Sequence, residues 1–348
     1  MSEQVIEHAV NVNAAGLSRN DYRGAASTLC QGCGHNSIAS QIVAACYELN
    51  IIPEKLMKFS GIGCSSKSPT YFMLRSFAFN GLHGRMPSLA IGASFADLSL
   101  KVFAVSGDGD TASIGMGQFK HAVRRNIPMV YIVENNGVYG LTKGQFSATV
   151  EQGMFLKRQG VSKYLPVDIC MEALAAHASF VARSFAGDPK QVKDLIKAAL
   201  SHRGIAVLDI ISPCVTFNNK EDTIHSYAFG KDNEEQLHGM TFVPARDEIM
   251  IEDYEEGEVK AVKLHDESTI LLKKLERDYD PTNRAEAFRV LDEGYRTRQL
   301  VTGLLYIDPE EPVLHDKFNL VEGPLNRLQE PDLRPKSGTL DKINASMR

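Results

Sequence analysis

The sequence contains no long apolar segment and no excess of positive charge. No apolar run approaches the roughly 20 residues of a membrane-spanning helix. Lysine and arginine together number 38 against 43 acidic residues, a net charge of -5, which gives no reason to expect nucleic acid as a partner. The first 20 residues lack the basic-then-apolar layout of a secretory signal. We therefore expect a cytoplasmic protein with neither a membrane nor nucleic acid as its partner.

Cysteine is also scarce, with six residues in 348. So few cysteines in a reducing compartment predict no disulfide framework. Cys30 and Cys33 form a CxxC pair, which is typical of metal, cluster or redox sites. Cys46 and Cys170 lie in apolar, helix-like stretches and are predicted to be small buried side chains.

Short apolar runs that end in turn residues alternate with helical patterns along residues 36–211. The runs predict strands at 56–60, 101–105, 129–133, 179–183 and 205–211, and the patterns predict helices at 36–49, 115–125 and 189–202. Asn36 or Ser37 is the expected N-cap of the first helix, and Pro189 suits the first turn of the last. The alternation predicts an α/β fold with a parallel sheet and helices on both faces.

The character of the sequence changes after about residue 215. We expect an irregular N-terminal arm at 1–27, an α/β domain at 28–220 and a C-terminal extension at 221–348. Within the extension, residues 257–275 predict a charged hairpin with its turn at 265–268. Residues from 307 onward are rich in Pro, Asp, Glu and Lys, and are expected to wrap around a partner or to be partly disordered.

Unusual residues follow four of the predicted strands. They lie at 61–64, 107–110, 135–136 and at Cys214. Ligands of open parallel sheets bind beyond the carboxyl ends of the strands. The sequence therefore predicts one site that contains a glycine-rich acidic turn, an amide pair and two cysteines.

The acidic turn is Gly107-Asp108-Gly109. Flanking glycines let the backbone approach a phosphate closely, and the carboxylate can hold Mg²⁺. Together with Asn135-Asn136 after the next strand, this pattern resembles the fingerprint of thiamine diphosphate (ThDP) enzymes. That resemblance implies Mg²⁺ ligation by Asp108, Asn136 and the carbonyl of Val138. The alternative is two unrelated turns.

Cys64 and Cys214 at strand ends complete a quartet with Cys30 and Cys33. Four thiolates suit either zinc or a [4Fe–4S] cluster, and their spacing does not separate the two. A redox dithiol would open the helix of a thioredoxin-like unit, and no such unit precedes Cys30.

Five stretches resemble the β subunit of 2-oxoacid:ferredoxin oxidoreductases, in order and at similar spacing, within residues 25 to 220. They are Cys-Gln-Gly-Cys-Gly at 30–34, Gly-Ile-Gly-Cys-Ser at 61–65, Leu-His-Gly-Arg at 82–85, Gly-Asp-Gly-Asp at 107–110 and Tyr-Gly-Leu-Thr-Lys-Gly-Gln at 139–145. The resemblance implies a ThDP diphosphate-binding fold with a [4Fe–4S] cluster on the four cysteines. It places the cofactor against Gly63, Ser65, His83, Gly107, Asp108, Gly109, Asp110, Asn136, Val138, Gly140, Leu141 and Thr142. Residues 146–149 read Phe-Ser-Ala-Thr where relatives often have Ala-Ser-Pro-Thr, and we attach no functional change to this difference.

The resemblance also implies roles for two side chains in catalysis. In relatives that accept 2-oxoglutarate, a lysine at the position of Lys67 meets the distal carboxylate, and Leu141 would line the same pocket. A buried carboxylate is costly without a cation. The alternative is a solvated surface lysine. His83 would lie near the diphosphate or the substrate, and its alternative is a histidine held by a turn.

The expected activity is oxidative decarboxylation of 2-oxoglutarate with coenzyme A to succinyl-CoA and CO₂, with electrons passing through the cluster to ferredoxin, reversibly in principle. Too little regular sequence remains for a second ThDP domain. An α subunit, or α and γ subunits, would therefore supply the pyrimidine-domain glutamate in a heterodimer or a dimer of heterodimers. The alternatives are the same chemistry on pyruvate or another 2-oxoacid, half of a non-redox ThDP decarboxylase or carboligase, and a non-catalytic zinc-binding interaction subunit.

Overall fold

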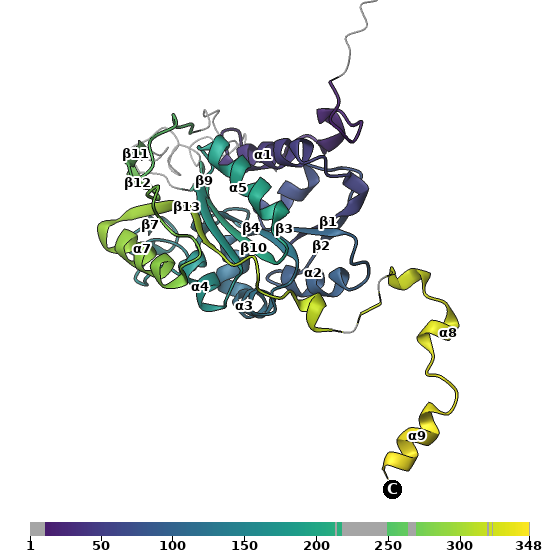
Figure 1. Ribbon diagram of the computed structural model, residues 1–348. Helices are drawn as coiled ribbons and strands as arrows, with labels where there is room; N and C mark the ends of the chain where they lie inside the picture. Colours follow the sequence, from purple (N-terminus) through teal and green to yellow (C-terminus); the bar gives the residue numbers. More distant parts are fainter. Residues whose placement is uncertain are drawn as a thin grey trace, which may run out of the picture.

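A nine-stranded sheet forms the centre of the molecule (Figure 1). The computed structural model describes residues 11–212, 214–217, 249–263, 269–318, 320–321 and 323–347. The strands are β1 (Leu56–Ser60), β2 (Phe77–Asn80), β3 (Lys101–Gly107), β4 (Met129–Asn135), β9 (Phe180–Phe185), β10 (Ile205–Ile211), β11 (Val259–Lys263), β12 (Thr269–Lys274) and β13 (Gln299–Ile307). Their spatial order is β11-β12-β13-β9-β10-β4-β3-β1-β2.

The sheet is mostly parallel. The strands from β9 to β2 all run in one direction, which confirms the prediction for this part of the sheet. β13 is antiparallel to β9, and β11 is antiparallel to β12. The three strands from the predicted C-terminal extension therefore enlarge the same sheet instead of forming a separate layer.

Helices cover both faces of the sheet, as predicted (Figure 1). The helices are α1 (Gly34–Glu48) and α5 (Pro189–Ser201) on one face, and α2 (Met86–Ser94), α3 (Met116–Arg124), α4 (Ile169–Ala175) and α7 (Arg284–Thr297) on the other. Successive side chains of a strand point to opposite faces. In β4, Val130 and Ile132 accordingly join the core under α1 and α5, while Tyr131 and Val133 join the other core.

The start of α1 differs from the prediction. The helix begins at Gly34 with Cys33 as its N-cap, so the expected cap at Asn36 or Ser37 is wrong. A turn already leads into the helix, because the Cys33 N–H donates to the Cys30 carbonyl at 3.2 Å. Asn36 reinforces this turn by donating from Nδ2 to the same carbonyl at 3.2 Å.

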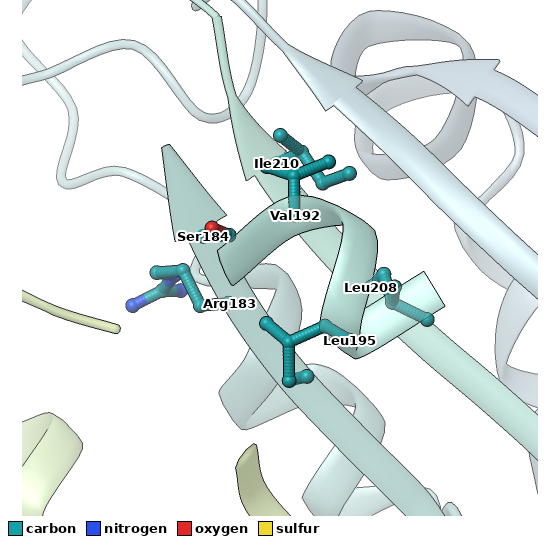
Figure 2. Close-up of a pocket in the computed structure, with 7 residues that line it drawn as sticks. Arg183, Ser184, Val192, Leu195, Leu208 and Ile210 are labelled. Atoms are coloured by element: carbon teal, nitrogen blue, oxygen red, sulfur yellow. The ribbon is translucent and has the colours of Figure 1, made fainter. Parts of the chain in front are cut away.

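Helix α5 packs on the sheet through aliphatic side chains (Figure 2). Val192 and Leu195 of the helix line a narrow crevice with Leu208 and Ile210 of β10. Pro189 stands in the first turn of α5, as predicted. The crevice belongs to the packing of the core and lies apart from the glycine-rich strand ends.

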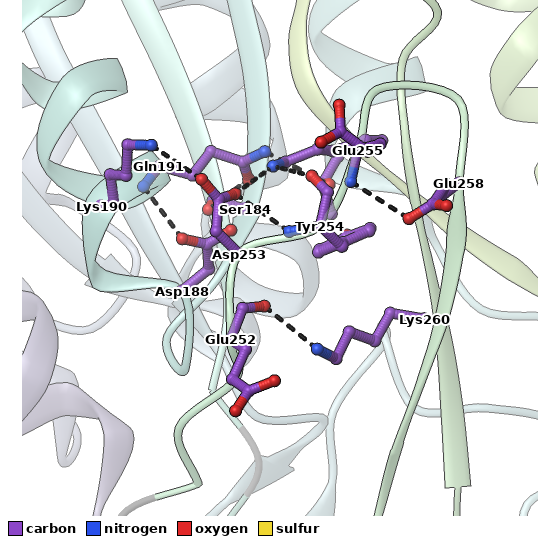
Figure 3. A network of polar contacts seen from close by, with 12 residues as sticks. Ser184, Asp188, Lys190, Gln191, Glu252, Asp253, Tyr254, Glu255, Glu258 and Lys260 are labelled. Atoms are coloured by element: carbon purple, nitrogen blue, oxygen red, sulfur yellow. Dashed lines mark hydrogen bonds and ion pairs between the residues drawn. The ribbon is translucent and has the colours of Figure 1, made fainter.

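The strands of the predicted charged hairpin are confirmed as the antiparallel pair β11 and β12, while the expected turn at 265–268 lies outside the described residues. A polar network joins this region to α5 (Figure 3). Asp253 accepts from Lys190 at 2.7 Å and from Lys274 at 2.5 Å, and Lys260 donates to the Glu252 carbonyl at 3.2 Å. Exposed ion pairs stabilise a fold little. Backbone pairing of β12 with β13 is therefore the main attachment.

The N-terminal arm is described from residue 11 onward and is packed against the body. Tyr22 is fully buried, and its hydroxyl accepts from Asn13 Nδ2 at 2.8 Å. Its carbonyl accepts the Met73 N–H at 2.8 Å. The arm is irregular, as expected, apart from the 3₁₀ turn Arg19–Tyr22.

After β13 the chain first stays packed on the body, where Val313 and Leu314 are buried. Residues 323–347 extend away from the sheet and end in α9 (Thr339–Ser346), where Leu340 is 69% exposed (Figure 1). Among the described residues, no helix combines the length and the apolar character needed to cross a membrane.

Two of the cysteines behave as small hydrophobic residues. Cys46 and Cys170 are fully buried, which confirms that prediction. Burial raises the pKa of the Cys46 thiol to about 12. Both residues are therefore expected to stay protonated and unreactive at neutral pH.

Lys58 of β1 is a buried cation that no carboxylate pairs with among the described residues. Its Nζ donates to the carbonyls of Phe72 at 2.5 Å and Met73 at 3.0 Å. Burial lowers the pKa of Lys58 to about 8. Above this pH the unfolded chain binds the proton more tightly than the folded chain, so stability rises with pH. The measured quantity is the difference between the free energies of unfolding of the wild type and of Lys58→Met. We expect this difference, wild type minus variant, to rise by up to about 3 kcal/mol as the pH rises from about 8 to about 10.5.

Urea denaturation at a series of pH values would measure this difference. Lys55→Met is the matched control, because Lys55 is exposed and precedes the same strand. If the difference in free energy of unfolding between the wild type and Lys58→Met does not change with pH, the prediction is wrong.

Candidate functional site

The carboxyl ends of β1, β3 and β4 open into one cleft. Its wall is completed by the residues of β5 (Val138–Tyr139), which pairs with β6 (Gln145–Phe146). Every position predicted to contact the cofactor lines this cleft, namely Gly63, Ser65, His83, Gly107, Asp108, Gly109, Asp110, Asn136, Val138, Gly140, Leu141 and Thr142. The fold thus brings the separate motifs together, while their roles in binding stay predictions.

Asp108 lies at the centre of the cleft and is buried. Its carboxylate accepts the Asn136 N–H at 3.2 Å and the Thr149 hydroxyl at 2.8 Å, and it also contacts the Ser147 hydroxyl. Burial raises the pKa of Asp108, and the three donors partly oppose this rise. A bound cation would stabilise the charged carboxylate further.

The oxygen atoms beside Asp108 fit Mg²⁺. A carboxylate offers about four acceptor positions, and the three donors leave one of them open. The side-chain oxygen of Asn136 accepts the Val138 N–H at 3.1 Å, which leaves its second acceptor position open. A carboxylate, an amide oxygen and a backbone carbonyl are the kinds of ligand that Mg²⁺ prefers.

Ser147 and Thr149 were missed as candidate residues. Both hydroxyls contact the same oxygen of Asp108, and Thr149 Oγ1 also lies 3.0 Å from Asn135 Oδ1. The segment 146–149 differs from the family motif at its first and third positions but keeps the serine and the threonine. Retention of these two hydroxyls was the signal that could have found them.

Asp110 holds two neighbouring loops in place. Its Oδ1 accepts the Gly84 N–H at 2.7 Å and contacts His83 Nδ1, while its Oδ2 accepts from Ser106 at 2.8 Å. A Cβ added at Gly61 would lie 1.6 Å from Oδ2, so only glycine fits there. We assign a proton to Nδ1 of His83, because the Asp110 carboxylate can only accept in this contact. His83 is 33% exposed, so it both lines the cleft and is held by the fold.

Tyr139 is a third residue that sequence reasoning overlooked. Its hydroxyl donates to the Gly109 carbonyl at 3.0 Å, and a Cβ added at Gly109 would lie 2.6 Å from its ring. The ring also meets that of His83 edge to face, with 5.8 Å between the centroids. Tyr139 therefore fixes the acidic turn against the β5 side of the cleft.

The four predicted cluster cysteines lie close enough to influence one another. Burial raises the pKa of Cys33, with smaller contributions from Cys214 and Cys30. Burial likewise raises the pKa of Cys64, to which Cys30 adds, and it raises the pKa of Cys214 to about 12, to which Cys64 and Cys30 add. At Gly140, an added Cβ would lie 3.4 Å from Cys64 Sγ and 3.8 Å from Cys214 Sγ. The quartet thus faces one small volume beside the cleft.

The chemistry of these four side chains fits either zinc or an iron–sulfur cluster. Zinc takes four thiolates in a tetrahedral structural site, and a [4Fe–4S] cluster is likewise held by four cysteine thiolates. The choice between the two groups stays a prediction.

Of the two predicted catalytic residues, His83 lines the cleft and Lys67 does not. It stands one turn after Cys64, in the 3₁₀ segment Ser65–Thr70, and is partly buried. Its charge acts to lower the pKa of Cys64, against the larger effect of burial. Leu141, its predicted neighbour in the substrate pocket, lines the cleft and is 49% exposed.

Two family matches cover the chain on either side of residues 211–268. Residues 61–210 match the family described as thiamine pyrophosphate enzyme, C-terminal TPP binding domain. Residues 269–322 match the family described as pyruvate ferredoxin oxidoreductase beta subunit, C terminal. The first match confirms the predicted ThDP-binding fold, and the second accounts for the strands that follow it.

Individual relatives agree with these families. The 2-oxoacid:ferredoxin oxidoreductase subunit beta of Saccharolobus solfataricus is 44% identical over 193 residues, which are 55% of this chain and 63% of that protein. The 2-oxoacid:ferredoxin oxidoreductase 1, subunit beta of Aeropyrum pernix is 36% identical over 239 residues, which are 68% of this chain and 72% of that protein.

A solved structure also resembles the chain over almost its whole length. It is the 2-oxoglutarate:ferredoxin oxidoreductase of Magnetococcus marinus with 2-oxoglutarate, coenzyme A and succinyl-CoA bound. The TM-score is 0.69 and the identity 29%, and the match covers 95% of this chain and 96% of the other. On its sequence, its fold and its strand-end motifs, the chain belongs to the family of 2-oxoacid:ferredoxin oxidoreductase beta subunits.

Proposed function

We propose that this chain, with a partner subunit, catalyses the ThDP-dependent oxidative decarboxylation of 2-oxoglutarate with coenzyme A to succinyl-CoA and CO₂, and passes the electrons to ferredoxin. The observation that carries the proposal is the cleft itself. It brings an oxygen-ligand set for Mg²⁺ next to the cysteine quartet, because Cys64 lines the cleft and an added Cβ at Gly140, which also lines it, would lie 3.4 Å from Cys64 Sγ and 3.8 Å from Cys214 Sγ. A decarboxylase that transfers no electrons would not require the cysteine quartet. An interaction subunit would not require the acidic turn.

The residues of the chain have separate roles in this proposal. When bound, thiamine diphosphate supplies the nucleophilic carbon and the electron sink for decarboxylation. Asp108, Asn136 and the Val138 carbonyl would hold the Mg²⁺ of its diphosphate, while Ser147 and Thr149 orient Asp108. Only glycine fits at positions 107 and 109, because an added Cβ would lie 2.7 Å from Ser65 Oγ at the first and 2.6 Å from the Tyr139 ring at the second.

The remaining side chains prepare the cleft for a substrate. Asp110 would accept from Nδ1 of His83 and so orient the imidazole ring beside the diphosphate or the substrate. The four cysteines Cys30, Cys33, Cys64 and Cys214 would hold a [4Fe–4S] cluster, which accepts electrons one at a time.

The proposal requires a second polypeptide. Residues 28–220 would form the diphosphate-binding domain, between the arm at 1–27 and the extension at 221–348. An α subunit, or α and γ subunits, would supply the pyrimidine-domain glutamate, in a heterodimer or a dimer of such heterodimers. The M. marinus structure, which holds 2-oxoglutarate and coenzyme A, supports this choice of substrates. Pyruvate or another 2-oxoacid is the alternative.

Lys67 is the residue we propose for selection of a dicarboxylate. Lys67→Ala should lower kcat/KM for 2-oxoglutarate by about 10- to 100-fold, which is the value of a charge-assisted hydrogen bond to a carboxylate. Turnover of pyruvate should be unchanged, because pyruvate has no distal carboxylate. Steady-state dye reduction with each 2-oxoacid measures both values, with Lys55→Ala as the control. Equal losses on both substrates would show that Lys67 supports the site in general and does not select the substrate.

The test of the function itself is co-expression with the partner subunit and anaerobic purification. We expect about four irons per chain, bound ThDP, and reduction of a low-potential dye that depends on 2-oxoglutarate and coenzyme A. Iron and ThDP with activity on another 2-oxoacid alone would change the substrate and keep the mechanism. Zinc without ThDP would overturn the proposal.

A further inference from the structure

A cationic and aromatic surface lies beside the cysteine quartet. Residues 152–165 carry three cations and no carboxylate, in a chain whose net charge is -5. These residues form the small antiparallel pair β7 (Phe155–Leu156) and β8 (Gly160–Val161) and the chain around it. Lys157, Arg158 and Lys163 are all exposed, and Phe155 and Tyr164 are 52% and 85% exposed.

The tip of this pair contacts the strands that lead to the quartet. The side-chain oxygen of Gln159, at the tip, accepts the Phe146 N–H of β6 at 2.7 Å. Phe146 pairs with Val138 of β5, and Gly140 directly after β5 faces the thiols of Cys64 and Cys214. Paired strands lie about 5 Å apart. The tip of the β7–β8 pair is thus separated from Gly140 by the width of the β5–β6 pair.

A fourth cation lies on the same short connection. Lys143 is exposed in the turn between β5 and β6, and its N–H donates to the Gly140 carbonyl at 3.2 Å. The basic hairpin surface therefore consists of Lys143, Lys157, Arg158 and Lys163 together with Phe155 and Tyr164.

We propose that the basic hairpin surface is the docking site of a small acidic protein that carries single electrons away from the quartet, an inference that rests on the proposed function. Carboxylates of the carrier would pair with the four cations, and its apolar centre would cover the two aromatic side chains. In each encounter the carrier gains one electron and this protein loses one, while no bond forms or breaks.

The charge of the surface selects this partner. The chain as a whole is acidic, so it repels an acidic protein everywhere except where cations gather. Electrostatic attraction at such a patch raises the rate of encounter and weakens as salt is added. The aromatic side chains make the surface more suitable for a protein than for a free phosphate, because protein interfaces are enriched in exposed Tyr and Phe.

The test uses the full complex with its partner subunit and compares two double variants. Lys157→Glu with Lys163→Glu reverses two charges of the surface. The matched control is Lys55→Glu with Arg124→Glu, which changes the net charge equally at exposed positions. Lys55 and Arg124 precede β1 and β4, so they lie at the opposite edge of the sheet.

The readouts are 2-oxoacid-dependent reduction of an acidic ferredoxin and of a small viologen dye, at low and high salt. We expect the KM for ferredoxin to rise about tenfold or more in the surface variant at low salt, and to approach that of the wild type at high salt. The viologen rate and the iron and ThDP contents should stay unchanged, and the control should resemble the wild type.

Three results would overturn the proposal. An unchanged KM for ferredoxin would show that the carrier docks elsewhere. A raised KM for coenzyme A alone would assign the surface to the phosphates of that substrate. Loss of the partner subunit on gel filtration would make it a subunit interface. Absence of viologen reduction by the wild type would instead refute the proposed function.

Discussion

Asp108→Asn is expected to weaken retention of Mg²⁺ and thiamine diphosphate by about 100-fold or more, with the fold intact. The carboxylate is the one anionic group among the three proposed Mg²⁺ ligands, so an amide removes most of the attraction for the cation. The fold should tolerate the change. Asparagine has the same shape, and its oxygen can still accept the Asn136 N–H now bound by Asp108 at 3.2 Å. Burial already raises the pKa of Asp108, so a neutral side chain spares the cost of a buried charge.

Equilibrium dialysis of ThDP with Mg²⁺, together with thermal unfolding of the cofactor-free protein, separates the two effects. Because burial raises the pKa of Asp108, protons compete with Mg²⁺ for this carboxylate toward acidic pH, so the affinity of the wild type for Mg²⁺ should increase as the pH rises through that pKa. Asp108→Asn should lose this pH dependence. Asp194→Asn, at an exposed position of α5, is the control. If Asp108→Asn retained as much ThDP as the wild type, Asp108 would not be a metal ligand.

The strands that position Asp108 and Asn136 were predictable because their sequences carry one unambiguous signal. Each is a short run of branched and aromatic residues ended by glycine or asparagine, and a parallel sheet gathers such ends at one edge. β13 was missed although Leu, Val, Tyr and Ile recur along it, whereas β2 carries no such signal. All four residues of β2 are exposed at the sheet edge, so no buried face marks its pattern.

The polar contacts within the cleft were less predictable, since they join segments far apart in the chain. Ser147 and Thr149 reach Asp108, and Asp110 reaches His83, only after the sheet has formed. Local sequence does not encode such contacts. Only the serine and threonine retained from the family motif pointed to one of them, the contact of Ser147 and Thr149 with Asp108. The position of Lys67 outside the lining of the cleft also follows from the path of the chain after Cys64, which no periodicity reveals.

Arg183→Met is expected to lower the free energy of unfolding by about 3–5 kcal/mol, because it leaves a buried carboxylate without its cation. Arg183 is buried in β9, where its Nε donates to Asp209 at 3.0 Å and its Nη2 donates to Asp168 at 2.7 Å. Burial opposes the charge of Arg183, but these carboxylates keep its pKa well above the usual value. Burial raises the pKa of Asp209 even in the presence of Arg183, and removal of the cation would raise it further.

The loss of Arg183 should also affect the hydrogen bonds in the cleft. Asp209 also accepts from Asn135 Nδ2 at 3.0 Å, and Asn135 Oδ1 lies 3.0 Å from the Thr149 hydroxyl that contacts Asp108. A shift of Asp209 would therefore disturb the hydrogen bonds that orient Asp108. We expect Arg183→Met to weaken ThDP retention as well as stability, although Arg183 is not in the lining of the cleft.

The origin of the stability loss can be measured by urea denaturation of Arg183→Met alone and combined with Asp209→Asn. The double variant should recover part of the loss, because it removes the uncompensated charge. The sign of the pH dependence gives a second check. In Arg183→Met the folded state would hold the Asp209 proton more tightly than the unfolded state, so stability should rise as the pH falls from about 8 to about 5. If the double variant is no more stable than Arg183→Met, and the loss is the same at both pH values, the cost comes from lost packing and hydrogen bonds and not from a buried charge.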